Sequence, residues 1–166
     1  MKRLVIMLVL FLGALSTLHG QSKEKYHFMF EWVKEPNWSD ADAQKGTFSI
    51  YISDRTFPIL MMFNRDNGEK ESKKLMKFVI CDDEDILHFP TEDNSATYSF
   101  GMKEYSGRMQ LRMTIMEDDG SGKQQPSVQL FNKEGSEYEQ QNNEEFLQLL
   151  QNAKSKKLNN FQIDLF

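Results

Sequence analysis

Residues 109–115 read Met-Gln-Leu-Arg-Met-Thr-Ile, with apolar and polar residues in strict alternation. A period of two places successive side chains on opposite faces of an extended strand. Antiparallel sheets commonly have one buried face and one solvated face. We therefore predict a strand here whose Gln110, Arg112 and Thr114 face water.

Other parts of the chain repeat this pattern. Residues 48–53 alternate in the same way, and one predicted strand face near the N-terminal end is aromatic: Tyr26, Phe28, Phe30 and Trp32. The runs 57–63 and 75–81 are apolar on nearly both faces, which is typical of central strands. Between them, residues 65–68 read Arg-Asp-Asn-Gly and predict the turn that joins them. Shorter strands are predicted at residues 86–89, 96–103 and 127–131.

The C-terminal part carries a helical pattern. An apolar stripe recurs at positions i, i+3, i+4 and i+7: Phe146, Leu149, Leu150 and Ala153. This spacing predicts an amphipathic helix over residues 143–154, with Asn142 as its N-cap. Alternating residues 161–165 predict a final strand. Because a lone amphipathic helix must cover something apolar, we expect it across a sheet face or a barrel mouth.

These patterns together predict the fold class. Many short strands separated by turn residues indicate a mainly β protein. We predict an antiparallel β-sandwich or partly closed barrel with one C-terminal amphipathic helix and a final strand. We find no internal repeat and no low-complexity linker that would divide the chain.

The N-terminal segment has the features of a secretory signal peptide. Lys2 and Arg3 form a basic region, residues 5–15 are largely apolar, and small or polar residues follow. The apolar run is shorter than the roughly 20 residues that a membrane-spanning helix needs, which disfavours an N-terminal anchor as the alternative. We predict a signal peptide at residues 1–20 and a single mostly-β exported domain at residues 21–166.

The segment also predicts where the protein goes. Cleavage after Gly20 would leave Gln21 as the first residue, and cleavage after Ser16 is the alternative. No cysteine lies near the end of the apolar run, so a lipoprotein is not expected. The predicted location is secreted or periplasmic, with no transmembrane segment after cleavage.

The charge of the chain argues against one class of partner. Loss of Lys2 and Arg3 with the signal peptide takes the formal net charge from −5 to −7. An acidic domain repels the phosphate backbone, so nucleic acid is not expected as a partner.

Cys81 is the single cysteine. The fold of the protein must therefore be stable without an intramolecular disulfide. Cys81 ends an apolar run and is interpreted as a small buried hydrophobic residue, because nothing in the sequence places a base beside it to make a nucleophile.

Two acidic segments are candidate cation sites. Residues 82–85 are Asp-Asp-Glu-Asp, and residues 118–120 are Asp-Asp-Gly. Both lack the alternating spacing of a calcium-binding loop. We interpret them as solvated turns between strands.

The histidines and methionines are candidate metal ligands or catalytic groups. His27 and His88 remain after cleavage, and neither has a partner at a recognised ligand spacing. The pair His27 and Met29 on one strand face is the strongest candidate for a soft metal such as Cu(I). We favour half-buried strand histidines and a methionine-padded core instead.

Trp32 and Trp38 flank a polar loop. We expect Trp32 in the core and Trp38 over its rim, although an aromatic residue at a loop tip can also stack on a sugar or a peptide. The triplet Asn37-Trp38-Ser39 matches the glycosylation acceptor pattern.

The sequence assigns no catalytic, cofactor-binding or metal-binding residue and implies no cofactor. The leading interpretation is an exported non-enzymatic binding or interaction domain, whose partner is an unknown protein or small ligand. One alternative is an exported hydrolase whose catalytic groups converge only in three dimensions. Another is a carrier that holds an apolar ligand in a barrel interior lined by Met and Phe.

Overall fold

The computed structural model describes residues 25–53, 59–76, 78–155 and 162–164. The predicted signal peptide at residues 1–20 and the predicted first residue of the exported chain lie outside the described residues.

The described part of the chain forms one ten-stranded antiparallel sheet and one helix, α2 (Glu139–Ser155). The order across the sheet is β10-β5-β6-β7-β8-β9-β1-β2-β3-β4. The prediction of a mainly β fold with one C-terminal helix and a final strand is confirmed. The strands are β1 (Lys25–Lys34), β2 (Gln44–Ser53), β3 (Ile59–Asn64), β4 (Lys70–Lys74), β5 (Phe78–Cys81), β6 (Leu87–Pro90), β7 (Ala96–Tyr105), β8 (Arg108–Asp118), β9 (Gln124–Phe131) and β10 (Gln162–Asp164).

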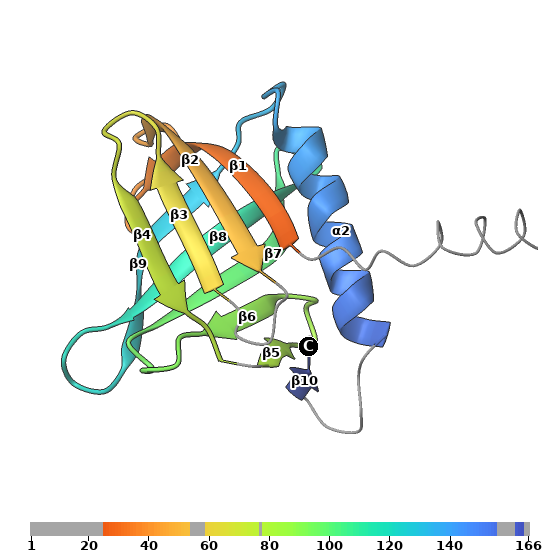
Figure 1. Ribbon diagram of the computed structural model, residues 1–166. Helices are drawn as coiled ribbons and strands as arrows, with labels where there is room; N and C mark the ends of the chain where they lie inside the picture. Colours follow the sequence, from red (N-terminus) through yellow and green to blue (C-terminus); the bar gives the residue numbers. More distant parts are fainter. Residues whose placement is uncertain (1–24, 54–58, 77, 156–161, 165–166) are drawn as a thin grey trace, which may run out of the picture.

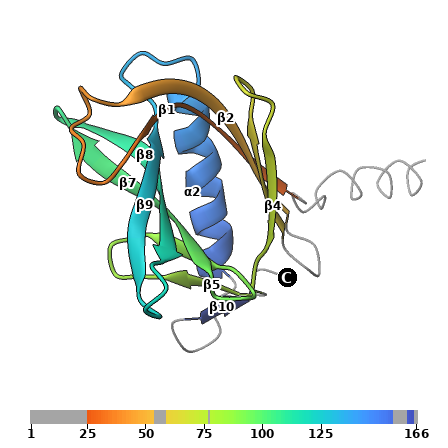
Figure 2. The same cartoon turned by 90° about the vertical axis from the view of Figure 1, so that its left-hand side faces the viewer.

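The sheet is strongly curved, so that β1–β4 face β7–β9 across the core (Figures 1 and 2). β4 and β10 end the strand order and do not pair with each other. The chain just beyond β4 nevertheless meets the chain just beyond β6 through a bridge between Leu75 and Thr91. The amide of Met76 also donates to the carbonyl of Pro90 at 2.9 Å. These contacts partly close the barrel at one end.

The other side of the barrel opens between β1 and β8. β9 pairs with β1 only through Trp32–Lys34, and it pairs with β8 only from Arg112 onward. The two flanking strands therefore diverge, and α2 lies along the gap (Figure 1). The helix fills the place that a continued strand would take.

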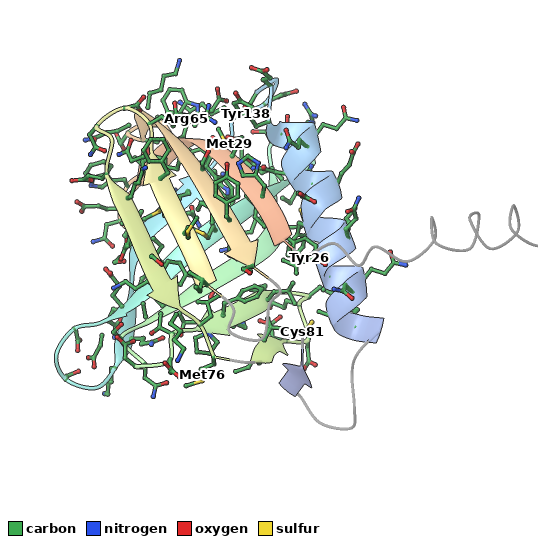
Figure 3. The ribbon with its side chains drawn as sticks, in the orientation of Figure 1. Tyr26, Met29, Arg65, Met76, Cys81 and Tyr138 are labelled. Atoms are coloured by element: carbon green, nitrogen blue, oxygen red, sulfur yellow. The ribbon has the colours of Figure 1, made fainter. Side chains whose placement is uncertain are left out.

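Side-chain amides connect this gap to the helix. Asn142 of α2 accepts from the amide of Met29 at 2.9 Å and donates to its carbonyl at 2.7 Å. Asn143 reaches the other side and accepts from the amide of Leu111 at 3.1 Å. Near the far end of the helix, Asn152 donates to the hydroxyl of Tyr26 at 2.8 Å, between β1 and α2 (Figure 3).

The predicted apolar stripe of the helix is confirmed. Phe146, Leu149, Leu150 and Ala153 are all buried in the same core as the inward side chains of the strands. The predicted N-cap is wrong, because α2 begins at Glu139 and Asn142 lies inside it. Side-chain hydrogen bonds to the backbone stabilise an earlier start of the helix. The hydroxyl of Ser136 accepts from the amide of Tyr138, and the carboxylate of Glu139 accepts from the amide of Gly135.

The sequence did not predict β4, and the predicted pairing of its neighbour β3 with the run at 75–81 is wrong. β4 reads Lys-Glu-Ser-Lys-Lys and has no apolar pattern, as suits an edge strand protected by charge. The turn at residues 65–68 is present, with Gly68 at a φ of 73°. It joins β3 to β4 and not to the run at 75–81, whose strand β5 pairs with β6 and β10.

A bulge changes the face of Trp32. The register of β1 on β2 shifts between Phe30 and Trp32, so that Trp32 pairs with Lys45. Val33 consequently packs against the core, and Trp32 lies partly buried beneath the ammonium of Lys133, 3.5 Å from the ring centroid. The prediction of Trp32 as a core residue is therefore wrong.

Cys81 is less buried than predicted. It ends β5, packs against the core from a half-buried position and has no disulfide (Figure 3). Its thiol donates to the carbonyl of Asp82 at 3.7 Å.

Candidate functional site

A buried arginine lies on the outer face of β8. The predicted solvated face is wrong for Gln110 and Arg112, which are only 6 % and 7 % exposed. Leu111, Met113 and Ile115 on the opposite face are core residues, as predicted, but the same prediction is wrong for Met109, which is 51 % exposed. The alternation was therefore identified correctly, but the outer face is covered.

The cover is the loop of residues 35–43 between β1 and β2. Its Asp40 binds Arg112 through both guanidinium NH groups, and the Nη1 to Oδ1 distance is 3.1 Å. Nη1 also donates to Gln129 at 3.0 Å. Lys34 adds a second cation, with its Nζ 2.5 Å from Asp40. A buried arginine requires partners of this kind, because an unpaired buried charge is costly.

The ionisation of Asp40 follows from these contacts. The hydrogen bonds from Arg112 have the largest effect, partial burial opposes them, and Lys34 reinforces them. The balance lowers the pKa of Asp40 to about 2. The carboxylate is therefore charged at all ordinary pH values, and the loop stays bound to β8.

Aromatic rings enclose the guanidinium. Its central carbon lies 4.6 Å from the ring centroid of Phe131 and 5.3 Å from that of Tyr105. Phe131 is buried, whereas Tyr105 near the β7–β8 turn is 50 % exposed. These distances are typical of cation–π contacts, which are strongest where water is excluded.

A pocket of about 310 Å³ adjoins this cluster, and we call it the Gln110 pocket. Four segments build it: the covering loop, the β7–β8 hairpin, the end of β9 with the connection that follows it, and the start of α2. Its lining residues are Asp40, Ala41, Tyr105, Ser106, Arg108, Gln110, Phe131, Lys133, Glu134 and Glu139.

The polar groups of the pocket differ in how they are paired. Arg108 contacts Glu134 at 2.7 Å and Glu139 at 3.6 Å. The side-chain oxygen of Gln110, in contrast, is buried and has no hydrogen-bond partner within the described structure. Buried polar atoms in proteins are nearly always hydrogen-bonded, so this oxygen requires an explanation.

A second polar cluster lies on the outer face of β6 and β7. His88 and Ser99 are cross-strand neighbours, and their Nδ1 and Oγ atoms are 2.8 Å apart. The His88 Nε2 is 3.0 Å from the carboxylate of Asp82. This is a serine–histidine–aspartate chain, which the sequence did not indicate because its members lie on three separate segments.

The surroundings of this chain do not favour acyl transfer. Ser99 lies within β7, which pairs with β6 and with β8, so the neighbouring amides are used in the two ladders. An oxyanion hole needs free amides or similar donors beside the nucleophile. Asp82 also has a structural role, because its Oδ1 accepts from the amides of Ile86 and Glu84 at 2.8 and 3.0 Å.

The carboxyl of Asp82 is correspondingly acidic. Partial burial raises its pKa, but hydrogen bonds from His88 and from the amides of Ile86 and Glu84 outweigh this effect. The net result is a lowered pKa for Asp82. The carboxylate can therefore orient His88 whether or not any chemistry takes place there.

The structure separates the remaining candidates. The ring of His27 stacks on Tyr51 with centroids 4.2 Å apart, and the sulfur of buried Met29 accepts a hydrogen bond from Ser49 at 2.7 Å. Residues 83–85 are exposed between β5 and β6, and Asp119 and Gly120 are exposed just beyond Asp118, the exposed last residue of β8. Among the described residues, no group of three or more His, Cys, Asp or Glu side chains is placed to hold a metal ion.

The loop between Trp32 and Trp38 agrees with the sequence prediction only in part. Trp38 is half-buried, and its carbonyl accepts from Lys34 at 3.1 Å, which helps to hold the covering loop. Asn37 is exposed. The glycosylation pattern there stays a prediction.

A further pocket of about 360 Å³ lies at β2, β3 and β4. Phe48 and Met62 form its apolar part, and both pack against the core. Its rim is polar and consists of Asn64, Glu69, Lys70 and Glu71.

The sequence did not indicate any residue of the Gln110 pocket as a site residue. Gln110, Arg112 and Asp40 looked like ordinary surface residues. The one available signal was an arginine at the centre of an apolar strand, which is informative only when a carboxylate is known to cover it.

No helix in the described part of the chain is long and apolar enough to span a membrane. Comparisons of this chain with protein-family models, with curated proteins and with solved structures found no match.

Proposed function

We propose that this chain is an exported, non-enzymatic domain that binds a small ligand in the Gln110 pocket. The observation that carries the proposal is Gln110, which lines the pocket and whose buried side-chain oxygen has no hydrogen-bond partner among the described residues. A ligand that donates a hydrogen bond to the Gln110 amide, once the side chain turns it into the pocket, would satisfy this oxygen.

The size and construction of the pocket support this role. Small-molecule sites generally have volumes of about 300–1,000 Å³ and combine apolar walls with a few placed polar groups. The pocket has about 310 Å³, with Tyr105 and Phe131 as aromatic walls. Gln110 lies on a central strand, and such elements hold a side chain more precisely than a loop does.

The apolar-carrier alternative has weaker support. The barrel interior is occupied by large side chains that are essentially unexposed, among them Phe28, Phe100 and Phe146. Phe28 and Phe100 pack against each other with ring centroids 5.0 Å apart. The pocket at Phe48 and Met62 is another place where an apolar ligand could bind.

The binding role is tested by mapping a fragment library onto the protein by NMR. We expect fragments to shift the amide resonances of Tyr105, Gln110 and Glu139. The variant Gln110→Leu, which keeps the size of the side chain but removes its acceptor, should lose these shifts. Gln125→Leu makes the same change at an exposed position of β9 and should retain them. A library that leaves the pocket resonances unmoved would contradict the proposal.

A second candidate, an exported hydrolase, is favoured by the Ser99–His88–Asp82 chain. A fluorophosphonate probe, which reacts with activated serines, distinguishes the two. The binding proposal predicts no labelling of Ser99. Labelling that disappears in both Ser99→Ala and His88→Ala would establish the hydrolase instead.

A further inference from the structure

We infer that the Gln110 pocket takes a neutral sugar, with one pyranose ring placed between Tyr105 and the buried amide of Gln110. This inference rests on the proposed binding function and names its ligand class. It follows from three properties of the pocket wall: the pairing of its charges, the mixture of its donors and acceptors, and its aromatic surface.

The charged groups of the wall are already paired. Asp40 is held by Arg112 and Lys34. Arg108 lies between Glu134 and Glu139, and the ammonium of Lys133 lies over the ring of Trp32. A charged ligand would have to break these pairs or leave its own charge unmatched. The wall therefore favours a ligand without net charge.

Donors and acceptors are mixed around the pocket. Arg108 and Lys133 can only donate hydrogen bonds, whereas Glu134 and the Gln110 oxygen accept them. A hydroxyl group can do both, so adjacent ring hydroxyls can donate to one wall group and accept from the next. The Gln110 oxygen, which has no partner among the described residues, would accept from a ligand hydroxyl or amide N–H.

The aromatic wall suits the apolar side of such a ring. Tyr105 lines the pocket and is half exposed, and the guanidinium of Arg112 lies 5.3 Å from the centroid of its ring. A flat, fixed aromatic surface can pack on the C–H face of a pyranose while the ring hydroxyls meet the polar wall. A fully apolar ligand could pack on the same wall, but it would have no hydrogen-bond donor for the Gln110 oxygen.

The test is an NMR titration of the full exported chain with defined probes. The neutral probes are D-glucose, D-galactose, D-mannose and N-acetyl-D-glucosamine. The contrasting probes are D-glucuronate, D-glucosamine and a capped alanine tripeptide, which carry a negative charge, a positive charge and peptide amides. We expect at least one neutral sugar to shift the resonances of Tyr105 and Gln110, and the contrasting probes to leave them in place.

The variants connect binding to the named contacts. Gln110→Leu should weaken sugar binding about tenfold, the effect of losing one good hydrogen bond. Tyr105→Ala should also weaken binding, whereas Gln125→Leu should not. Because Gln110→Leu removes an unsatisfied buried acceptor, the variant should melt no lower than the parent chain. A loss of binding in this variant is then not a loss of folding.

The outcomes separate this inference from the proposed function. If the glucuronate, the glucosamine or the peptide binds the pocket and the neutral sugars do not, the sugar inference is wrong and the binding function stands. If sugars bind equally well to Gln110→Leu, the inference is also wrong. If all probes and the fragment library leave the pocket unmoved, both are overturned.

Discussion

Asn142 on α2 acts as a strand partner for Met29 on β1. Its side-chain amide accepts from the Met29 amide at 2.9 Å and donates to the Met29 carbonyl at 2.7 Å, as a neighbouring backbone would. Asn132 donates a further hydrogen bond to the same carbonyl at 2.8 Å. The helix is thus attached to the open edge of the barrel by polar contacts as well as by its apolar stripe.

Replacing Asn142 by Ala should destabilise the protein. The substitution leaves the amide of Met29 buried without a partner, and such a group costs about 1–3 kcal/mol. The better helix propensity of Ala offsets part of this cost. Urea denaturation measures the difference. Gln141→Ala, at an exposed position one residue earlier, should be neutral. Equal midpoints for the two variants would show that the Asn142 contact does not hold the helix.

The apolar stripe can be tested with two leucines of the same helix. Leu149 is fully buried, and Leu147 is 55 % exposed. Leu149→Ala should lower the free energy of unfolding by about 2–5 kcal/mol, because it removes buried methyl groups and leaves a cavity. Leu147→Ala should change it by no more than about 0.5 kcal/mol. Thermal unfolding of both variants checks this, and identical melting would mean that α2 is not part of the core.

The pair of Asp40 and Arg112 predicts a change of stability with pH. The pKa of Asp40 is about 2 in the folded chain, against an ordinary value of 3.8. A carboxyl group with a lowered pKa stabilises the fold above its unfolded value, and the stabilisation is lost as the pH falls through its folded value. The contribution of Asp40 should therefore be complete above about pH 4 and should decline towards pH 2.

Urea midpoints of the parent chain and of Asp40→Asn isolate this effect. At pH 7 the variant should be less stable by about 3–5 kcal/mol, because it leaves Arg112 buried without its carboxylate. The difference between the two proteins should shrink as the pH falls from 4 to 2. Asp83→Asn, the same change at an exposed position between β5 and β6, is the control. A constant difference across this pH range would contradict the assigned contact.

The N-terminal processing is tested by intact mass. The sequence predicts that protein recovered from outside the cytoplasm begins at Gln21, with a mass that lacks residues 1–20. A mass corresponding to a start at residue 17 would indicate the alternative cleavage after Ser16. Retention of all 20 residues would contradict the signal-peptide prediction.

Local patterns in the sequence were sufficient to predict the fold class and the buried face of most elements. The alternation in residues 109–115 was enough to identify β8 and to place Leu111 and Met113 in the core. The spacing of Phe146 and Leu149 likewise identified the buried stripe of α2. These are properties of local backbone geometry, because side chains alternate on a strand and recur after about 3.6 residues on a helix.

The sequence was insufficient where contacts between separate segments decide the structure. β4 was missed because an edge strand need not carry an apolar pattern. Trp32 was assigned to the core because the bulge that rotates it lies in the pairing of β1 with β2, which one strand alone does not show. Asn142 fitted an N-cap by its position, whereas its actual partner, Met29, is 113 residues away.

The candidate site depends on contacts between residues that are far apart in the sequence. Arg112 and Asp40 are 72 residues apart, and each on its own is an ordinary charged surface residue. Their contact buries Arg112 and covers the outer face that was predicted to be solvated. Gln110 has no local feature that marks it. It belongs to the candidate site because three other segments enclose its side chain and no described residue donates to its oxygen. Whether a polar atom is satisfied depends on everything packed around it.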